Sequence, residues 1–215
     1  MRHRVDEDVH EVERALSLAA TLGYQRPPGD DGRLDVVRPR ADDINPAGED
    51  PYVVVHPGAS VPARAPSPEW AARLVDALVE AGYRVVVTGS PGERELTARV
   101  AGRAATDLGG QTDLAGLAEV LAAADAVVVG NTGPAHLAAA VGTPVVSLFA
   151  PVVPAVRWRP WCVPHALLGD QRAQCRDTRA RVCPVDGHPC LNDVPVELAV
   201  ASVERLARER QAVAG

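Results

Sequence analysis

The sequence has few aromatic residues, which make up only 3% of its 215 positions. A core without large rings has to be filled by valine, leucine and alanine, as in parallel α/β proteins whose helices pack closely on a sheet. The chain also has no run of about 18 apolar residues and no signal peptide, so we expect a cytoplasmic protein with at most peripheral membrane contact. Positive charge is not in excess. The formal net charge of −6 argues against a nucleic-acid partner.

What the sequence does have is a regular alternation of strand and helix patterns from residue 52 onward. Short β-branched or apolar runs predict strands, and apolar residues at helical spacing between capping and stop signals predict helices. The predicted strands span residues 52–56, 84–89, 105–108, 126–129 and 145–149. The predicted helices span residues 69–81, 93–103, 114–123, 135–141 and 195–210. The alternation predicts an α/β fold with a doubly wound, mostly parallel, Rossmann-like sheet over residues 51–215.

Residues 1–50 are predicted to be a lead-in segment and not a domain. An amphipathic helix is expected over residues 9–22. The following stretch is rich in Pro, Gly and Asp, and only Leu34, Val36 and Val37 resemble a strand. So long an irregular lead-in is typical of a chain that lacks an N-terminal part. A second irregular segment is predicted over residues 151–193, where no hydrophobic period is found.

The most specific stretch is VVVGNTGPAHLAAAVGTPVVSLF, residues 127–149, which reads as strand, sharp turn, helix and second strand. The turn residues from Gly130 to Gly133 tolerate unusual backbone angles or cap a helix, and Pro134 suits the first helical position. The N–H groups of such a helix start attract anions, and His136 follows at a spacing that can reach a phosphate oxygen. A lone histidine there is more often structural, so both interpretations stay open.

Two further loops follow strand ends, HPGASVPARAPS from residue 56 and TGSPGE from residue 88. Ligands of open α/β sheets bind at the carboxyl ends of the strands, so we expect the turns after residues 56, 88 and 129 to converge. Each loop alone also fits a mobile surface loop, and Glu93 fits a helix cap. The three turns together favour a nucleotide or nucleotide-sugar site.

These residues carry a resemblance to a known family. The stretches HPGAS, VVVTGSPGE and the whole of residues 109–149, with the later cysteine-bearing tail, resemble the C-terminal half of glycosyltransferase family 9. This is the ADP-heptose:lipopolysaccharide heptosyltransferase family, which has the GT-B fold. The resemblance runs from about residue 52 to 206, and residues 1–50 are similar to the segment that joins the two halves. The N-terminal half of the family has no counterpart here.

The resemblance implies a donor-binding domain of an inverting enzyme that moves a heptose-like sugar from a nucleoside diphosphate to an acceptor hydroxyl. The donor, such as ADP-heptose, is a substrate, and neither a cofactor nor a metal is implied. The acceptor is a glycan or glycolipid of the cell envelope. The catalytic base is expected on the absent N-terminal acceptor domain, which could act in trans. Two alternatives stay open, a non-catalytic nucleotide-binding module of the same fold and half of a nucleotide-sugar epimerase.

The resemblance also implies roles for single residues. Thr132, Gly133 and His136 would hold the diphosphate, Glu93 the ribose, and the backbone around Thr112 the base. Asn131 stands where several heptosyltransferases carry Asp for the sugar, and its amide can also hydrogen-bond to hydroxyls. The family's phosphate-binding lysine falls near Ala63, so Arg64 is the expected substitute and, with His136, the expected stabiliser of the leaving group. The remaining predicted binding residues are Gly58, Ser60, Gly89 and Pro134.

Four cysteines, with two histidines nearby, raise the question of a zinc site. No Cys-x-x-Cys pair is present, and disulfides are not expected inside the cell. We therefore predict reduced thiols in an irregular flap and no structural metal, which metal analysis of the purified protein would check. The residues concerned are Cys162, Cys175, Cys183, Cys190, His165 and His188.

Overall fold

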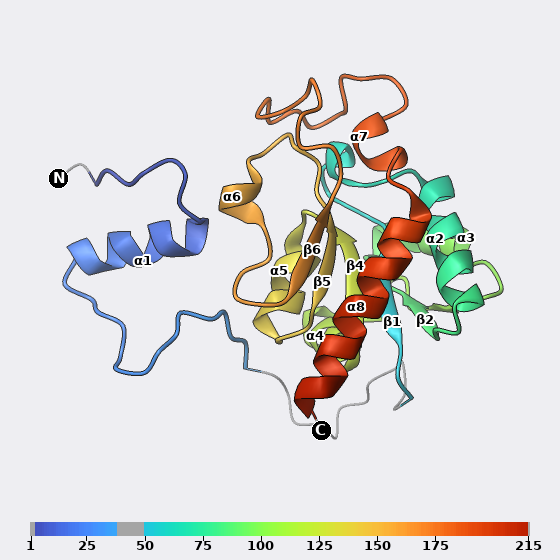
Figure 1. Ribbon diagram of the computed structural model, residues 1–215, viewed down its shortest axis with the longest axis horizontal. Coiled ribbons are helices and arrows are strands. Elements are labelled where there is room, and N and C mark those ends of the chain that lie inside the picture. The colour runs from blue at the N-terminus through green and yellow to red at the C-terminus, as the bar shows by residue number, and fades with distance from the viewer. Residues whose placement is uncertain (1–2, 38–49, 215) are drawn as a thin grey trace.

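The computed structural model describes residues 3–37 and 50–214, and its centre is a six-stranded sheet (Figure 1). Every paired strand runs parallel to its neighbour. The sheet order is β3-β2-β1-β4-β5-β6, so the strand order reverses between β1 and β4, as in Rossmann folds. The strands are β1 Val53–His56, β2 Val85–Val87, β3 Thr106–Asp107, β4 Ala126–Gly130, β5 Val145–Leu148 and β6 His165–Leu168. The predicted α/β Rossmann-like fold is confirmed.

Two of the helices begin directly after a residue whose side chain caps them. Ser67 caps α2 by accepting from Trp70 N, and Asp113 caps α4 by accepting from Gly116 N. The helices are α1 Glu11–Thr21, α2 Pro68–Glu80, α3 Arg94–Ala101, α4 Leu114–Ala123, α5 Gly133–Ala140, α6 Ala155–Trp158, α7 Pro189–Asn192 and α8 Val196–Ala214, with 3-10 turns η1 Pro62–Arg64 and η2 Pro91–Glu93. None of the helices in the described ranges is long and apolar enough to cross a membrane.

Helices cover both faces of the sheet. Because side chains alternate along each strand, every strand contributes residues to the core layers on both faces. On one face, α2, α3 and α8 form one core cluster that also contains Val53 and Val55 of β1 (Figure 1). On the other face, α4 and α5 pack against Val54. The core is made of valine, leucine and alanine with single Trp, Tyr and Phe residues, as the low aromatic content predicted. With both faces covered, only the ends of the sheet are open to a ligand.

One prediction about the irregular segments was wrong. It does not concern residues 34–37, which lie in the stretch predicted to be an irregular lead-in and form no strand; Val37 is fully exposed. Within the segment predicted to be irregular, residues 151–193, the chain forms β6 at the edge of the sheet, and the short helices α6 and α7. Strand β6 is half-buried, and its sequence, His-Ala-Leu-Leu, has no β-branched run like those of the central strands. The pattern used to predict strands therefore did not find it.

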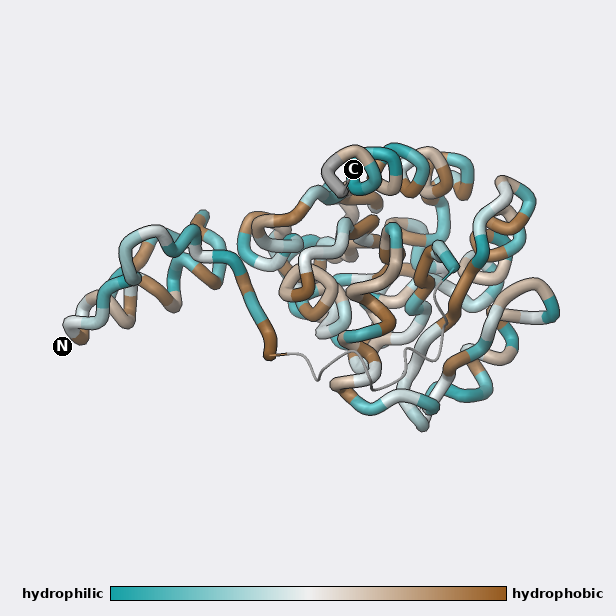
Figure 2. The backbone as a smooth tube through the Cα atoms, turned by 90° about the horizontal axis from the view of Figure 1, so that it is seen from below, coloured by the Kyte–Doolittle hydropathy of each residue, from teal (hydrophilic) through white to brown (hydrophobic). Residues whose placement is uncertain are grey.

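Residues 3–37 of the lead-in segment lie beside the domain, not on the sheet (Figure 2). Its helix α1 has no buried residue, and His10 caps it by accepting from Val12 N. The His10 ring stacks on Trp161 at 4.4 Å between ring centroids and hydrogen-bonds to the backbone oxygen of Arg159 at 2.9 Å. Arg157 Nε donates to the backbone oxygen of Glu7 at 2.8 Å. These contacts hold the start of α1 against the segment around α6.

Candidate functional site

A pocket of about 460 Å³ lies at the carboxyl edge of the sheet, where the strand order reverses. Turns that follow β1, β2, β3 and β4 line it, so the predicted convergence of the strand ends is confirmed. The predicted binding residues gathered there are Gly58, Ser60, Gly89, Glu93, Thr112, Thr132, Gly133 and Pro134. Arg64, Asn131 and His136 are not among the lining residues. Each of these three lies beside the turn after β4 or on α5.

Glu93 has the capping role that the sequence favoured. One carboxylate oxygen, Oε2, accepts from Ser90 N at 2.8 Å and from Ser90 Oγ at 2.7 Å, which closes a capping box at η2. The same carboxylate lies so close to Gly58 that a Cβ at this position would overlap Oε1. Gly58 therefore lets the carboxylate line the pocket. A ribose contact for Glu93 stays a prediction.

The turn after β4 ends in the start of α5. Pro134, expected at the first helical position, is the second residue of the helix, and Gly133 is the first. The N–H of Gly133 lies in the first turn, where helix N–H groups have no partner within the helix. Thr132 precedes the helix, and its Oγ1 is buried with no hydrogen-bond partner in the described part of the chain. The helix start thus presents unused polar groups beside the pocket.

Arg64 lies against the same turn. Its backbone oxygen approaches Gly130 so closely that a Cβ on Gly130 would overlap it. The Arg64 Nε is buried without a hydrogen-bond partner, and within residues 3–37 and 50–214 no carboxylate pairs with the guanidinium. Burial lowers the pKa of Arg64, and the nearby charge of Arg181 lowers it further. An uncompensated, partly buried cation next to a helix start is an arrangement that attracts an anion.

Ala63, which stands at the place of the family's lysine, is uncharged and fully buried. The positive charge next to this place comes from Arg64.

His136 lies on α5 and carries no charge at neutral pH. Burial lowers its pKa first, and the nearby His10 and then Arg64 lower it further. The ring of Trp158 meets it edge-on, with centroids 6.3 Å apart. The charge of Arg64 thus acts on the pKa of His136, and neither of these predicted leaving-group residues lines the pocket.

Asn131 is tied into the fold by its amide group. Its Oδ1 accepts from Ala150 N at 3.1 Å, and its Nδ2 donates to Ala150 O at 3.3 Å. The side chain is only 4% exposed. These bonds join the turn after β4 to the end of β5. Both polar atoms of the amide therefore already have backbone partners. The sugar-binding role implied by the resemblance stays a prediction.

Replacing Asn131 by alanine is expected to lower the free energy of unfolding by about 1–3 kcal/mol, because the N–H and C=O of Ala150 would lose buried partners. Urea denaturation measures this value. Gln111→Ala removes an exposed amide that donates to Asp107 O at 2.6 Å, and it calibrates the loss expected for a surface amide. An Asn131→Ala protein as stable as the original would show that these bonds contribute nothing.

His56 is a pocket residue for which the sequence predicted no role. It ends β1 and lines the pocket, and its Nδ1 lies 3.0 Å from Thr88 Oγ1. Burial lowers its pKa, and the negative charge of Glu93 opposes this shift. The position of His56 at the carboxyl end of a central strand was the feature of the sequence that could have identified it as a pocket residue.

The buried histidines make stability depend on pH. Burial lowers the pKa values of four histidines below 6.5, the value in unfolded chains. Between the folded and unfolded pKa values the unfolded chain binds more protons, so stability rises with pH there and is lost as the pH falls below about 6.5. The four residues are His10, His56, His136 and His188.

We therefore expect a lower free energy of unfolding at pH 5.5 than at pH 7.5, measured by urea denaturation at both values. Equal stability at the two pH values would contradict the assignment of neutral, buried imidazoles.

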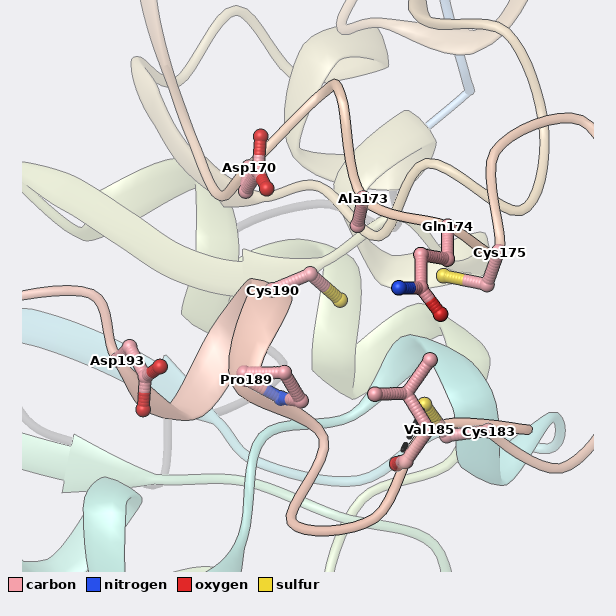
Figure 3. A pocket seen from close by; sticks show the side chains of 9 residues that line it. All are labelled: Asp170, Ala173, Gln174, Cys175, Cys183, Val185, Pro189, Cys190 and Asp193. Atoms are coloured by element: carbon pink, nitrogen blue, oxygen red, sulfur yellow. Dashed lines mark hydrogen bonds between the residues drawn. The ribbon is translucent and has the colours of Figure 1, made fainter.

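Three of the four cysteines share a second cavity of about 360 Å³, between the turn after β6 and α7 (Figure 3). The thiols of Cys175 and Cys190 point toward each other across it, and Cys183 donates to Val185 O at 3.4 Å. Burial, then the neighbouring Cys175 and Cys183, raise the pKa of Cys190 to about 12. All four cysteines, including the exposed Cys162, are free thiols. Within the described ranges, no three His, Cys, Asp or Glu side chains are arranged to hold a metal ion.

The parallel sheet with a pocket across its switch point defines an α/β Rossmann-like domain of the class that takes ligands at its strand ends. A comparison with protein families narrows this class. The model of glycosyltransferase family 9 (heptosyltransferase) matches residues 1–188. The chain therefore belongs to glycosyltransferase family 9, as its motifs indicated.

Individual relatives agree with this family. Lipopolysaccharide heptosyltransferase 3 of Escherichia coli K12 is 29% identical over 93% of this chain and 60% of its own length. Lipopolysaccharide heptosyltransferase 1 of Pseudomonas aeruginosa is 39% identical over 67% of this chain and 41% of its own length. The chain thus spans 60% or less of these two relatives.

Solved structures share the fold. The family 9 glycosyl transferase of Veillonella parvula has a TM-score of 0.78 at 17% identity, over 96% of this chain and 62% of that one. Escherichia coli heptosyltransferase WaaC with ADP has a TM-score of 0.63 at 23% identity, over 97% of this chain and 59% of that one. The fold of this chain is therefore that of a large part of a heptosyltransferase.

Proposed function

We propose that this domain binds the nucleoside diphosphate of a sugar donor in the pocket at the strand ends. The observation that carries the proposal is the convergence of four turns, which brings eight of the predicted binding residues to one pocket at the switch point. The heptosyltransferase relatives support a heptose as the sugar, and the structure of a relative with ADP supports adenine as the base. The donor is a substrate, and no cofactor or metal is part of the proposal.

The polar groups around α5 fit the diphosphate. In the described part of the chain, Arg64 Nε and Thr132 Oγ1 are buried without a hydrogen-bond partner, and the N–H of Gly133 lies in the first turn of α5, where N–H groups have no partner within the helix. An anion placed among them would satisfy all three and lie at the positive end of the helix dipole. His136 is neutral in the free protein, and a diphosphate beside it would favour its protonated form. These groups would stabilise the charge that develops on the departing nucleoside diphosphate.

The other end of the pocket fits a nucleoside. Leu114 and Leu117 provide apolar surface, and the backbone around Thr112 offers hydrogen-bonding groups to a base. Glu93 faces the pocket from the side of Gly58, where it would accept from ribose hydroxyls with the oxygen that is not part of the capping box. The proposed nucleoside thus lies near the start of α4, and the proposed diphosphate lies at the start of α5.

In the whole reaction, an acceptor hydroxyl of a cell-envelope glycan or glycolipid would attack the anomeric carbon with inversion. The base that takes its proton is expected on an N-terminal acceptor domain, supplied in trans if necessary, in the cytoplasm. The lipopolysaccharide heptosyltransferases similar to this chain support that acceptor class. Supplying such a domain in trans and assaying donor turnover separates an active half from a non-catalytic module, since transfer would exclude the latter.

Replacing Arg64 by alanine is expected to weaken ADP binding by about 10- to 100-fold, because a charge-assisted contact to phosphate is lost. Isothermal titration calorimetry at low salt measures the affinity. Arg73→Ala is the matched control, since it removes the same charge from an exposed position on α2. Absence of ADP and GDP binding at about 1 mM would contradict the proposed function. Equal losses in both variants would remove Arg64 from the site.

A further inference from the structure

The segment 181–194, which we call the strap, crosses the loop that carries Arg64. Ala63 N donates to Arg181 O at 3.0 Å, just before Arg64. Ser67 N donates to the side-chain oxygen of Asn192 at 2.8 Å. Trp70 Nε1 donates to Val194 O at 2.8 Å. Three hydrogen bonds between stretches more than 110 residues apart thus fasten the chain on both sides of Arg64.

Each bond falls at a point that controls the path of residues 63–70. The first holds η1, the second holds the residue that caps α2, and the third holds a tryptophan that is fully buried under the strap. Arg64 itself makes no ion pair in the described part of the chain that could hold its side chain in place. The position of its guanidinium is therefore set by the backbone, and the backbone is set by the strap.

The strap has its own anchors, so it can act as a fixed support. Asn192 Nδ2 donates to Gly187 O at 2.6 Å, which closes the turn that leads into α7. Asp170 N donates to Cys190 O at 3.0 Å. Cys190 and Leu191 of α7 are buried in the core. None of these contacts involves residues 63–70, so the strap would keep its shape if that loop moved.

We propose that Asn192 is a positioning residue of the donor site, which holds Arg64 in its place for the diphosphate although it does not line the pocket. This inference rests on the proposed function. The Asn192 amide bridges the two segments, because its oxygen receives the N–H of Ser67 and its nitrogen binds Gly187 within the strap. Without it, the bond from Ser67 N to the strap is lost, so the loop is no longer held on the α2 side of Arg64 by this amide.

The test compares ADP affinity in matched variants. Asn192→Ala is expected to weaken ADP binding about tenfold. Thr143→Ala is the control: it also removes one side-chain bond to the backbone, from Thr143 Oγ1 to Leu121 O at 2.7 Å, but at the amino edge of the sheet. Its ADP affinity should stay within about twofold of the original. In an Arg64→Ala background, Asn192→Ala should have no further effect, because there is no guanidinium left to position.

A second measurement needs no ligand. Hydrogen exchange of the amides from Ala63 to Ala65 should be about tenfold faster in Asn192→Ala and unchanged in Thr143→Ala. Unchanged ADP affinity in Asn192→Ala, or an equal loss with and without Arg64, would overturn the inference while leaving the proposed function intact. If the original protein binds no ADP, the proposed function fails, and unchanged exchange at Ala63–Ala65 would then overturn the strap as well.

Discussion

Replacing Trp70 by alanine is expected to lower the free energy of unfolding by about 3–5 kcal/mol, the range found for large aromatic residues in cores. Trp70 of α2 is fully buried in the core between the sheet and the C-terminal part of the chain. Its removal would leave a cavity and would also deprive Val194 O of the indole N–H. Urea denaturation followed by circular dichroism measures the change.

Trp158 provides the matched control for this substitution. It is 41% exposed, so Trp158→Ala leaves no closed cavity and should cost about 1 kcal/mol or less. A Trp70→Ala protein that loses no more stability than Trp158→Ala would show that the layer between α2 and the strap is not tightly packed.

Replacing Gly130 by alanine is expected to destabilise the protein by about 1–3 kcal/mol and to weaken ADP binding more than about tenfold. A Cβ at this position would overlap the backbone oxygen of Arg64, and no flexible side chain is available to give way. Either the turn after β4 or the η1 loop has to move. Both carry groups that the proposed diphosphate site needs.

Gly116→Ala is the control for the Gly130 substitution. A Cβ on Gly116 would have only ordinary contacts, and this position lies inside α4, where alanine is favoured by about 1 kcal/mol. ADP affinity should stay unchanged in this variant. If Gly130→Ala kept full stability and full ADP affinity, the close packing of Arg64 on β4 would be refuted.

Local signals were enough to predict most of the fold. Ser67 with Pro68 and Asp113 mark helix starts by chemistry that acts within three residues, and the valine runs mark strands buried on both faces. Strand β6 was missed because an edge strand is half-buried and needs no such run. Leu34, Val36 and Val37 resemble a strand locally, but residues 34–37 form none, as predicted for a lead-in segment.

The site was predictable where it depends on strand ends and not where it depends on distant partners. The turns after β1, β2 and β4 converge because parallel strands end at one edge. The pairing of Asn131 with Ala150, and the strap over Arg64, join residues that lie far apart in sequence. Nothing in the local pattern around Asn131 or Asn192 distinguishes an amide bound to backbone from one that faces a ligand.

The most direct test of the account is an NMR titration of the ¹⁵N-labelled 22.6 kDa protein with ADP. We predict saturable shifts of the amides of Gly58, Gly89, Thr112 and Gly133, which line the pocket at the strand ends. The amides around Cys175 and Cys190, in the other cavity, should not shift. No saturable shift at the strand ends, or shifts confined to the cysteine cavity, would contradict the proposed donor site.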